Sequence, residues 1–273
     1  MNKRHFTSAV SQIFGKFASK EHGPRFQSAI NRSYVRMMGL DMGEFESPES
    51  YPTLNALFTR RLKRKRSFSA DGRDVISPCD SLITECGTLH ENLALQIKGM
   101  RYSVDAFLGD HISVEDKKAI HNGTFANFYL SPRDYHRYHA PMDMQILGAV
   151  HIPGKLYPVN IPTLKKKVDL FIENERVVLE CLNSSGKRFF LILVGALNVG
   201  KMEVSFEPRI QTNTGATSTF YSYNQLHMSK GDDFGCFQMG STIVMLCEPD
   251  MVELGISVGH NVKFAQTIGR LIS

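Results

Sequence analysis

The chain has 273 residues, of which 42% are hydrophobic and 22% charged, so it can bury a sizeable core. Its formal net charge of +5 is too small an excess to indicate a dedicated nucleic-acid-binding protein. No Cys-x-x-Cys pair or zinc-finger pattern is present, which favours reduced, mostly buried cysteines. We find no secretory signal and no apolar run long enough to span a bilayer, and therefore expect a soluble or peripheral protein.

The amino-terminal part has helical patterns. In residues 6–17, apolar side chains recur at helical spacing and basic residues flank them, which predicts a basic amphipathic helix. Such a helix can lie in a membrane interface or pack on its own domain, and both interpretations stay open. His22-Gly23-Pro24 ends this pattern, and a second helix is predicted from Phe26 to Met38, stopped by Gly39.

A basic cluster follows a short helix predicted over residues 53–58. It comprises Arg60, Arg61, Lys63, Arg64, Lys65 and Arg66. These side chains, together with Lys165-Lys166-Lys167 further along, are candidates for contact with lipid phosphates. The alternative is a solvated charged face.

Beyond Asp74 the pattern changes from helix to strand. β-branched and aromatic residues predict strands at 75–80, 125–130, 175–182, 189–194, 201–206, 243–247 and 251–256. The predicted fold is α+β, with amino-terminal helices (residues 1–73) on a predominantly antiparallel β-rich body (residues 74–273).

The densest polar stretch runs from Leu130 to Pro141 and reads as a loop after a predicted strand. It contains Asp134, His136 and His139, which are candidates for acid–base chemistry. A zinc site made by the two histidines and Asp80 is an alternative, although no further ligand motif is evident.

A second candidate is the peptide Gly240-Ser241, set between an apolar, aromatic approach and a β-branched exit. A serine hydroxyl can reach back to the carbonyl before it, and glycine leaves that carbonyl uncovered. The attack needs a base, because an unassisted serine is a poor nucleophile at neutral pH. The alternative is that Gly240-Ser241 forms part of a plain turn.

Several motifs, in order, are similar to those of the phosphatidylserine decarboxylases, a family of pyruvoyl-dependent enzymes of phospholipid synthesis. They are Tyr51–Arg60, Ser77–Asp80, Leu130–Pro141, Pro153–Asn160 and Lys230–Thr242. The resemblance runs from about Tyr51 to the carboxyl end. Met239 stands where the family commonly has leucine, a swap that keeps size and polarity.

The resemblance implies a lyase made as a zymogen. Ser241 would attack the Gly240 carbonyl, with His139 as general base and Asp80 orienting it, and autocatalytic cleavage would leave a large chain of residues 1–240 and a small chain of residues 241–273. The former Ser241 would become a covalent pyruvoyl group, and no metal or external cofactor is implied.

The resemblance also implies the second reaction. The pyruvoyl group would form a Schiff base with phosphatidylserine, and loss of carbon dioxide would give phosphatidylethanolamine. His136 is the candidate proton donor, positioned by Asp134. The implied partners are the lipid substrate, a membrane surface on the cytoplasmic side of the cell membrane, where the protein would be peripheral, and the two chains of one precursor as a heterodimer. A further homo-oligomer is possible, and no nucleic acid is expected.

Two other classes of function are consistent with the residues. A hydrolase could use Ser241, His139 and Asp80 on an external ester or peptide, and it would stay a single chain. A non-catalytic, β-rich lipid-binding module would leave the polar crowding around His136 and His139 without a role.

Overall fold

The computed structural model describes residues 15–97, 100–159, 161–164, 166–197, 201–214, 217–238 and 241–272. Most of the amphipathic helix predicted for residues 6–17 lies outside these ranges, as do Lys165 and Gly240. Residues 15–19, at the described end of that prediction, are helical.

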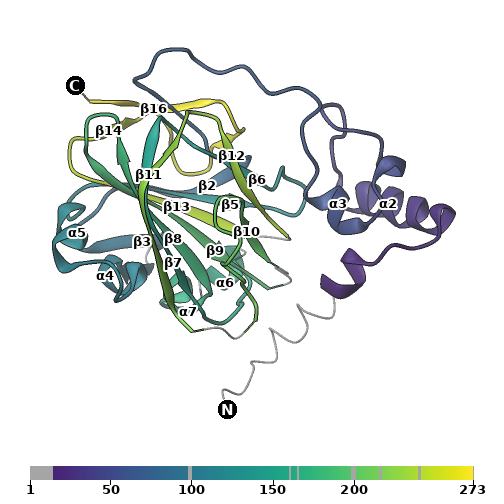
Figure 1. Ribbon diagram of the computed structural model, residues 1–273, viewed down its shortest axis with the longest axis horizontal. Coiled ribbons are helices and arrows are strands. Elements are labelled where there is room, and N and C mark those ends of the chain that lie inside the picture. The colour runs from purple at the N-terminus through teal and green to yellow at the C-terminus, as the bar shows by residue number, and fades with distance from the viewer. Residues whose placement is uncertain are drawn as a thin grey trace.

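The helical portion stands to one side of the sheets (Figure 1). It contains α2 (Pro24–Met38), the 3-10 helix η1 (Pro48–Ser50) and α3 (Leu54–Phe58). The predicted stop of α2 is confirmed, because Gly39 adopts the left-handed conformation with φ 65° and closes the helix. Thr53 caps α3 by accepting a hydrogen bond from the Ala56 amide. Leu57 and Phe58 are fully buried in a small core between these helices.

The β-rich portion begins at Asp74. Its strands are β1 (Asp74–Ile76), β2 (Ser81–Thr88), β3 (Leu93–Ile97), β4 (Met100–Ser103), β5 (Thr124–Leu130), β6 (Arg137–His139), β7 (Met144–Ile152), β8 (Arg176–Asn183), β9 (Arg188–Gly195), β10 (Met202–Val204), β11 (Thr219–Met228), β12 (Asp233–Phe237), β13 (Ser241–Cys247), β14 (Val252–Leu254), β15 (Asn261–Val262) and β16 (Thr267–Leu271). Short helices join some of them: α4 (Val104–Leu108), α5 (Val114–Ala119), α6 (Ile161–Leu164) and α7 (Leu170–Glu173).

The largest sheet has eight strands among the described residues, in the order β11-β7-β8-β9-β13-β5-β2-β15, and every neighbouring pair is antiparallel. Two three-stranded sheets, β10-β12-β6 and β1-β16-β14, are antiparallel as well. The predicted α+β class, with helices beside a largely antiparallel body, is therefore confirmed (Figure 1).

The predicted strands differ in accuracy. Those expected at 125–130, 175–182, 189–194 and 243–247 are confirmed as β5, β8, β9 and β13, with ends shifted by one or two residues. Those expected at 75–80, 201–206 and 251–256 form only the shorter β1, β10 and β14. The loop expected over Leu130–Pro141 is wrong at Arg137–His139, because these residues pair with β12 as β6.

The sheet β10-β12-β6 brings together segments that surround the predicted cleavage site. β12 ends at Phe237, shortly before that site, and β13 starts directly after it at Ser241. The Phe237 amide donates to the His136 carbonyl, so the approach to the site is tied to the polar stretch. Gly235 makes the close packing possible, since a Cβ there would overlap the Glu203 carbonyl of β10.

Candidate active site

Ser241 begins the central strand β13. It pairs with Leu130 at the end of β5 on one side and with Gly195 at the end of β9 on the other. The residue is fully buried, and its Oγ has no hydrogen-bond partner among the described residues. A buried hydroxyl is normally hydrogen-bonded, so such an atom calls for an explanation, and a reacting group is one.

Asp134 organises the loop between β5 and β6. Its Oδ2 accepts a hydrogen bond of 2.7 Å from the Ser131 amide, and its own amide donates to the Ser131 carbonyl at 2.9 Å. Burial raises the pKa of the Asp134 carboxyl above its usual range. The Asp134 carbonyl accepts a hydrogen bond of 2.8 Å from Nδ1 of His136.

His136 is fully buried, with its ring centroid 4.0 Å from that of Phe58 in α3. Burial lowers the pKa of His136 to about 3, so the ring is neutral at neutral pH. Because a carbonyl can only accept, Nδ1 carries the hydrogen and Nε2 carries the lone pair. Among the described residues Nε2 has no hydrogen-bond partner.

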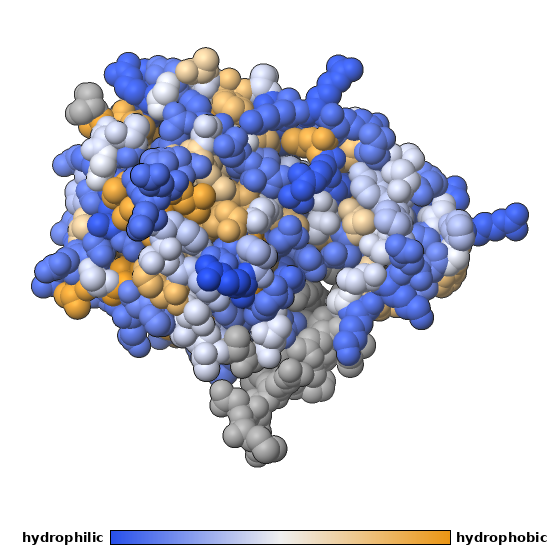
Figure 2. All heavy atoms as spheres, in the orientation of Figure 1, coloured by the Kyte–Doolittle hydropathy of each residue, from blue (hydrophilic) through white to orange (hydrophobic). Residues whose placement is uncertain are grey.

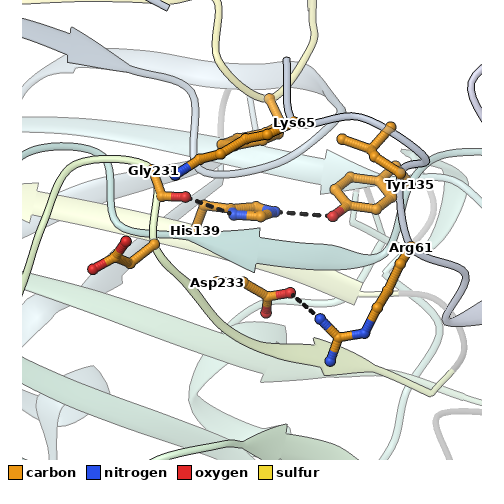
Figure 3. Close-up of a pocket in the computed structure, with 9 residues that line it drawn as sticks. Arg61, Lys65, Tyr135, His139, Gly231 and Asp233 are labelled. Carbon is orange, nitrogen blue, oxygen red and sulfur yellow. Dashed lines mark hydrogen bonds and ion pairs between the residues drawn. The ribbon is translucent and has the colours of Figure 1, made fainter. Parts of the chain in front are cut away.

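His139 lies in a different environment (Figure 3). Its Nδ1 donates to the Gly231 carbonyl at 3.2 Å, and its Nε2 accepts from the Tyr135 hydroxyl at 3.0 Å. The ring stacks on Phe264 with centroids 3.6 Å apart. Burial lowers the pKa of His139 to about 4, so this histidine is also neutral at neutral pH.

A cavity of about 230 Å³ adjoins His139. Lys65 and Arg61 of the basic cluster line it, and Asp233 lies beside Arg61 (Figure 3). The Arg61 guanidinium pairs with the Asp233 carboxylate at 3.1 Å, and Arg137 holds the same carboxylate through two contacts.

Asp80 is held by two groups other than His139. Arg66 donates to both carboxylate oxygens at 2.5 and 3.0 Å, and the Phe264 amide donates to Oδ1 at 2.7 Å. Among the described residues, no hydrogen bond joins Asp80 to His139. Both residues nevertheless touch Phe264, which stacks on His139 and binds Asp80 through its amide.

The structure therefore sorts the candidate residues into groups. Asp134 and His136 form one group. Asp80 and His139 form a second, in which both contact Phe264. Within the described part of the chain, the Ser241 hydroxyl makes no hydrogen bond with either group. The two histidines contact different residues, as expected for side chains three positions apart along extended chain, which point to opposite sides. Within the described ranges, no three His, Cys, Asp or Glu side chains are grouped as metal ligands.

Sequence reasoning missed several residues of the site. Arg60 and Arg66 were assigned to a lipid-contacting or solvated cluster, yet Arg60 is 2% exposed and Arg66 binds Asp80 and Glu44. The only indication that Tyr135 belongs to the site was its position within the polar stretch Leu130–Pro141. Nothing in the sequence indicated Phe264, because it lies far along the chain from the residues that it contacts.

Comparison with known proteins finds a matching family model and full-length relatives. The model described as phosphatidylserine decarboxylase matches residues 54–270. A protein of Helicobacter pylori named phosphatidylserine decarboxylase proenzyme is 45% identical over 269 residues, covering 96% of this chain and 97% of the relative. Proteins of the same name are 41% identical in Campylobacter jejuni, covering 96% and 98%, and 36% identical in Myxococcus xanthus, covering 90% and 87%.

Proposed function

This chain belongs to the phosphatidylserine decarboxylase family, and we propose from that premise that it cleaves itself between Gly240 and Ser241 and then converts phosphatidylserine to phosphatidylethanolamine. The family makes the chain a carboxy-lyase. We propose in addition where the chain is cleaved, that a pyruvoyl group forms from Ser241, and which side chains take part.

The Ser241 hydroxyl is the observation that carries the proposal. It is fully buried without a partner among the described residues, at the first position of a strand that is hydrogen-bonded on both sides. A strand anchored in this way fixes the position of its first residue. A buried, unpartnered hydroxyl fits a group that is consumed in forming a covalent pyruvoyl group.

The proposed cleavage begins when Ser241 Oγ bonds to the Gly240 carbonyl carbon as its proton passes to His139. His139 returns this proton to the Ser241 nitrogen as the C–N bond between Gly240 and Ser241 breaks, which leaves an ester. A base then removes the Cα proton of Ser241 as the Cβ–Oγ bond breaks, which releases a carboxylate at Gly240 and leaves a dehydroalanine. The dehydroalanine tautomerises to an imine, and water hydrolyses the imine to a pyruvoyl group and ammonia.

His139 must exchange a partner to take part in this step. Its low pKa makes it neutral and able to accept a proton, but Nε2 is bound to Tyr135 in this structure. Asp80 would orient the imidazole once the loop carrying Phe264 moves, since that residue contacts both side chains. We therefore assign Phe264 as the contact that opens when Asp80 and His139 meet.

A pyruvoyl group at this position supplies an electrophilic carbonyl and a sink for the electron pair left by loss of carbon dioxide. His136 handles the proton in this second reaction. Its Nε2 carries a lone pair, so it first accepts a proton from the ammonium group of phosphatidylserine and later returns it to the decarboxylated carbon. Asp134 keeps the ring in this tautomer through its carbonyl.

The test is incubation of the purified protein with phosphatidylserine vesicles, with phosphatidylethanolamine measured by mass spectrometry. We expect conversion by the wild-type protein and none by Ser241→Ala. A wild-type protein that hydrolyses ester substrates while making no phosphatidylethanolamine would establish the hydrolase alternative instead.

A further inference from the structure

The Asp134 carbonyl accepts two hydrogen bonds. One comes from Nδ1 of His136 at 2.8 Å, and the other comes from Nη2 of Arg60 at 3.2 Å. The same Nη2 also donates to the Arg133 carbonyl at 3.0 Å. One guanidinium nitrogen thus binds two consecutive carbonyls of the loop that precedes His136.

Arg60 occupies an unusual position for an arginine. It is 2% exposed, and among the described residues it makes no ion pair with a carboxylate. Its guanidinium lies 4.4 Å from the centre of the Phe45 ring. Only Nη2 of its three nitrogens makes hydrogen bonds, and Nε and Nη1 have no partner among the described residues. Burying an arginine with unused donors is costly, so its placement on these two carbonyls is the feature to explain.

The Arg60 contact bears on the state of His136. A carbonyl that already receives a charged donor is held in place and oriented, and the remaining lone pair is directed at Nδ1. That arrangement keeps the hydrogen on Nδ1 and the lone pair on Nε2. The positive charge of Arg60 adds to burial in lowering the pKa of His136.

The same segment of chain contacts the other side of the loop. Phe58 packs on the His136 ring, and it lies in α3 two residues before Arg60. The Tyr34 hydroxyl of α2 donates to the Pro132 carbonyl at 3.4 Å. The helical portion therefore holds the loop before His136, whereas the proton transfer proposed for the His136 ring takes place in the β-rich portion.

We propose that Arg60 is a positioning residue for the decarboxylation step, which holds the Asp134 carbonyl so that His136 stays in the tautomer with a free Nε2. This role rests on the proton transfer proposed above for His136. It assigns no contact with the substrate to Arg60. It also gives the helical portion a function in the site that is separate from any contact with lipid.

The direct test is the tautomer of His136 in protein labelled with 15N-histidine. The His136 ring signals are assigned by their loss in His136→Gln. In the wild-type protein we expect a neutral ring with hydrogen on Nδ1. In Arg60→Ala we expect a mixture of tautomers or a higher pKa, and in Arg60→Lys, which keeps a charged donor, we expect the wild-type tautomer.

Kinetics form the second arm. We expect Arg60→Ala to complete self-cleavage and to lower kcat by about tenfold or more, with little change in KM, because displacing a proton-transfer group affects the chemical step most. Arg60→Lys should recover part of kcat. Arg101→Ala, which removes an exposed arginine of β4, is the matched control and should keep the wild-type kcat.

A wild-type tautomer and an unchanged kcat in Arg60→Ala would overturn the proposal. If Arg60→Ala does not fold, Arg60→Met decides, since it keeps a long buried side chain and removes every hydrogen-bond donor. A wild-type tautomer and kcat in Arg60→Met would also overturn the proposal. Failure of the proposed function is distinguishable, because His136→Gln would then keep the wild-type kcat whatever Arg60 does.

Discussion

At the scale of single residues, the two histidines of the polar stretch have separate surroundings and therefore separable roles. His139 contacts Tyr135, Gly231 and Phe264, whereas His136 contacts Phe58 and the Asp134 carbonyl. Both are neutral in the fold, so each can accept a proton. We propose that the two histidines differ in the reaction that each serves.

We predict that His139→Ala stays a single chain, because Ser241 then lacks its base. His136→Ala should be cleaved normally and should decarboxylate at least about 10²-fold more slowly, the usual contribution of a general acid–base group. Gel electrophoresis follows cleavage, and release of carbon dioxide follows decarboxylation. His227→Ala, which removes an exposed histidine of β11, serves as the control. Normal cleavage of His139→Ala, or a wild-type rate for His136→Ala, would refute the corresponding role.

The low pKa values of the two histidines also predict a pH dependence of stability. Their pKa values of about 3 and about 4 in the fold lie below the ordinary value of 6.5, so the unfolded chain binds more protons in between. The free energy of unfolding should therefore fall as pH drops from about 6.5 to about 4. Thermal denaturation of the Ser241→Ala protein across this range measures it, and the dependence should weaken in a variant with glutamine at both positions. An equal dependence in that variant would show that other groups cause it.

At the scale of elements, β12 packs closely against β10 and ends shortly before the proposed cleavage site. A Cβ added at Gly235 would overlap the Glu203 carbonyl, so β10 and β12 would have to move apart to accept it. We predict that Gly235→Ala costs about 1–3 kcal/mol of stability and slows self-cleavage. Gly72→Ala is the control, since a Cβ there meets no atom within 4 Å. A Gly235→Ala protein with the wild-type melting temperature and cleavage rate would contradict this account of β12.

The sequence predicted those elements whose local pattern agrees with their surroundings. The strands β9 and β13 contain continuous apolar runs, β8 has apolar runs on both sides of Glu180, and α2 has both helical periodicity and a glycine stop. β11 was missed because its exposed and half-exposed residues alternate without a strong apolar face. β6 was missed because its three residues form a strand only through pairing with β12, which lies far along the chain.

The candidate site shows the same limit. Asp134, His136, His139 and Ser241 are predicted from short polar or Gly-Ser patterns, and the role predicted for Asp80 comes from the resemblance to the family. The residues that hold them, Arg60, Arg66 and Phe264, come from other segments and carry no local mark of their role. The partners of Asp80 could not be predicted, since the sequence does not show which basic side chain lies next to this carboxylate in the fold.

At the scale of the whole molecule, the helical portion offers apolar side chains to solvent. Phe17, Phe26 and Met37 are 45%, 61% and 71% exposed, and all belong to this portion. Figure 2 shows that the face of the molecule seen there is mostly hydrophilic, with hydrophobic atoms in separate patches. Of the helices in the described ranges, none has the length and hydrophobicity needed to cross a bilayer.

We propose that these three side chains insert into the membrane interface. Phe26→Glu combined with Met37→Glu should lower co-sedimentation with anionic liposomes by about tenfold or more, because each buried apolar side chain contributes about 1.5–3 kcal/mol. Val114→Glu with Val258→Glu is the matched control, since both valines are exposed on the β-rich body. Equal losses of binding in the two double variants would mean that this surface has no special role.

Self-cleavage between Gly240 and Ser241 is the central proposal for the whole molecule. Intact-mass spectrometry of the wild-type protein beside Ser241→Ala tests it directly. We predict two chains for the wild type, one ending at Gly240 and one beginning with a pyruvoyl group, and a single chain of full mass for the variant. A fully active wild-type protein that remains one unmodified chain would contradict the account.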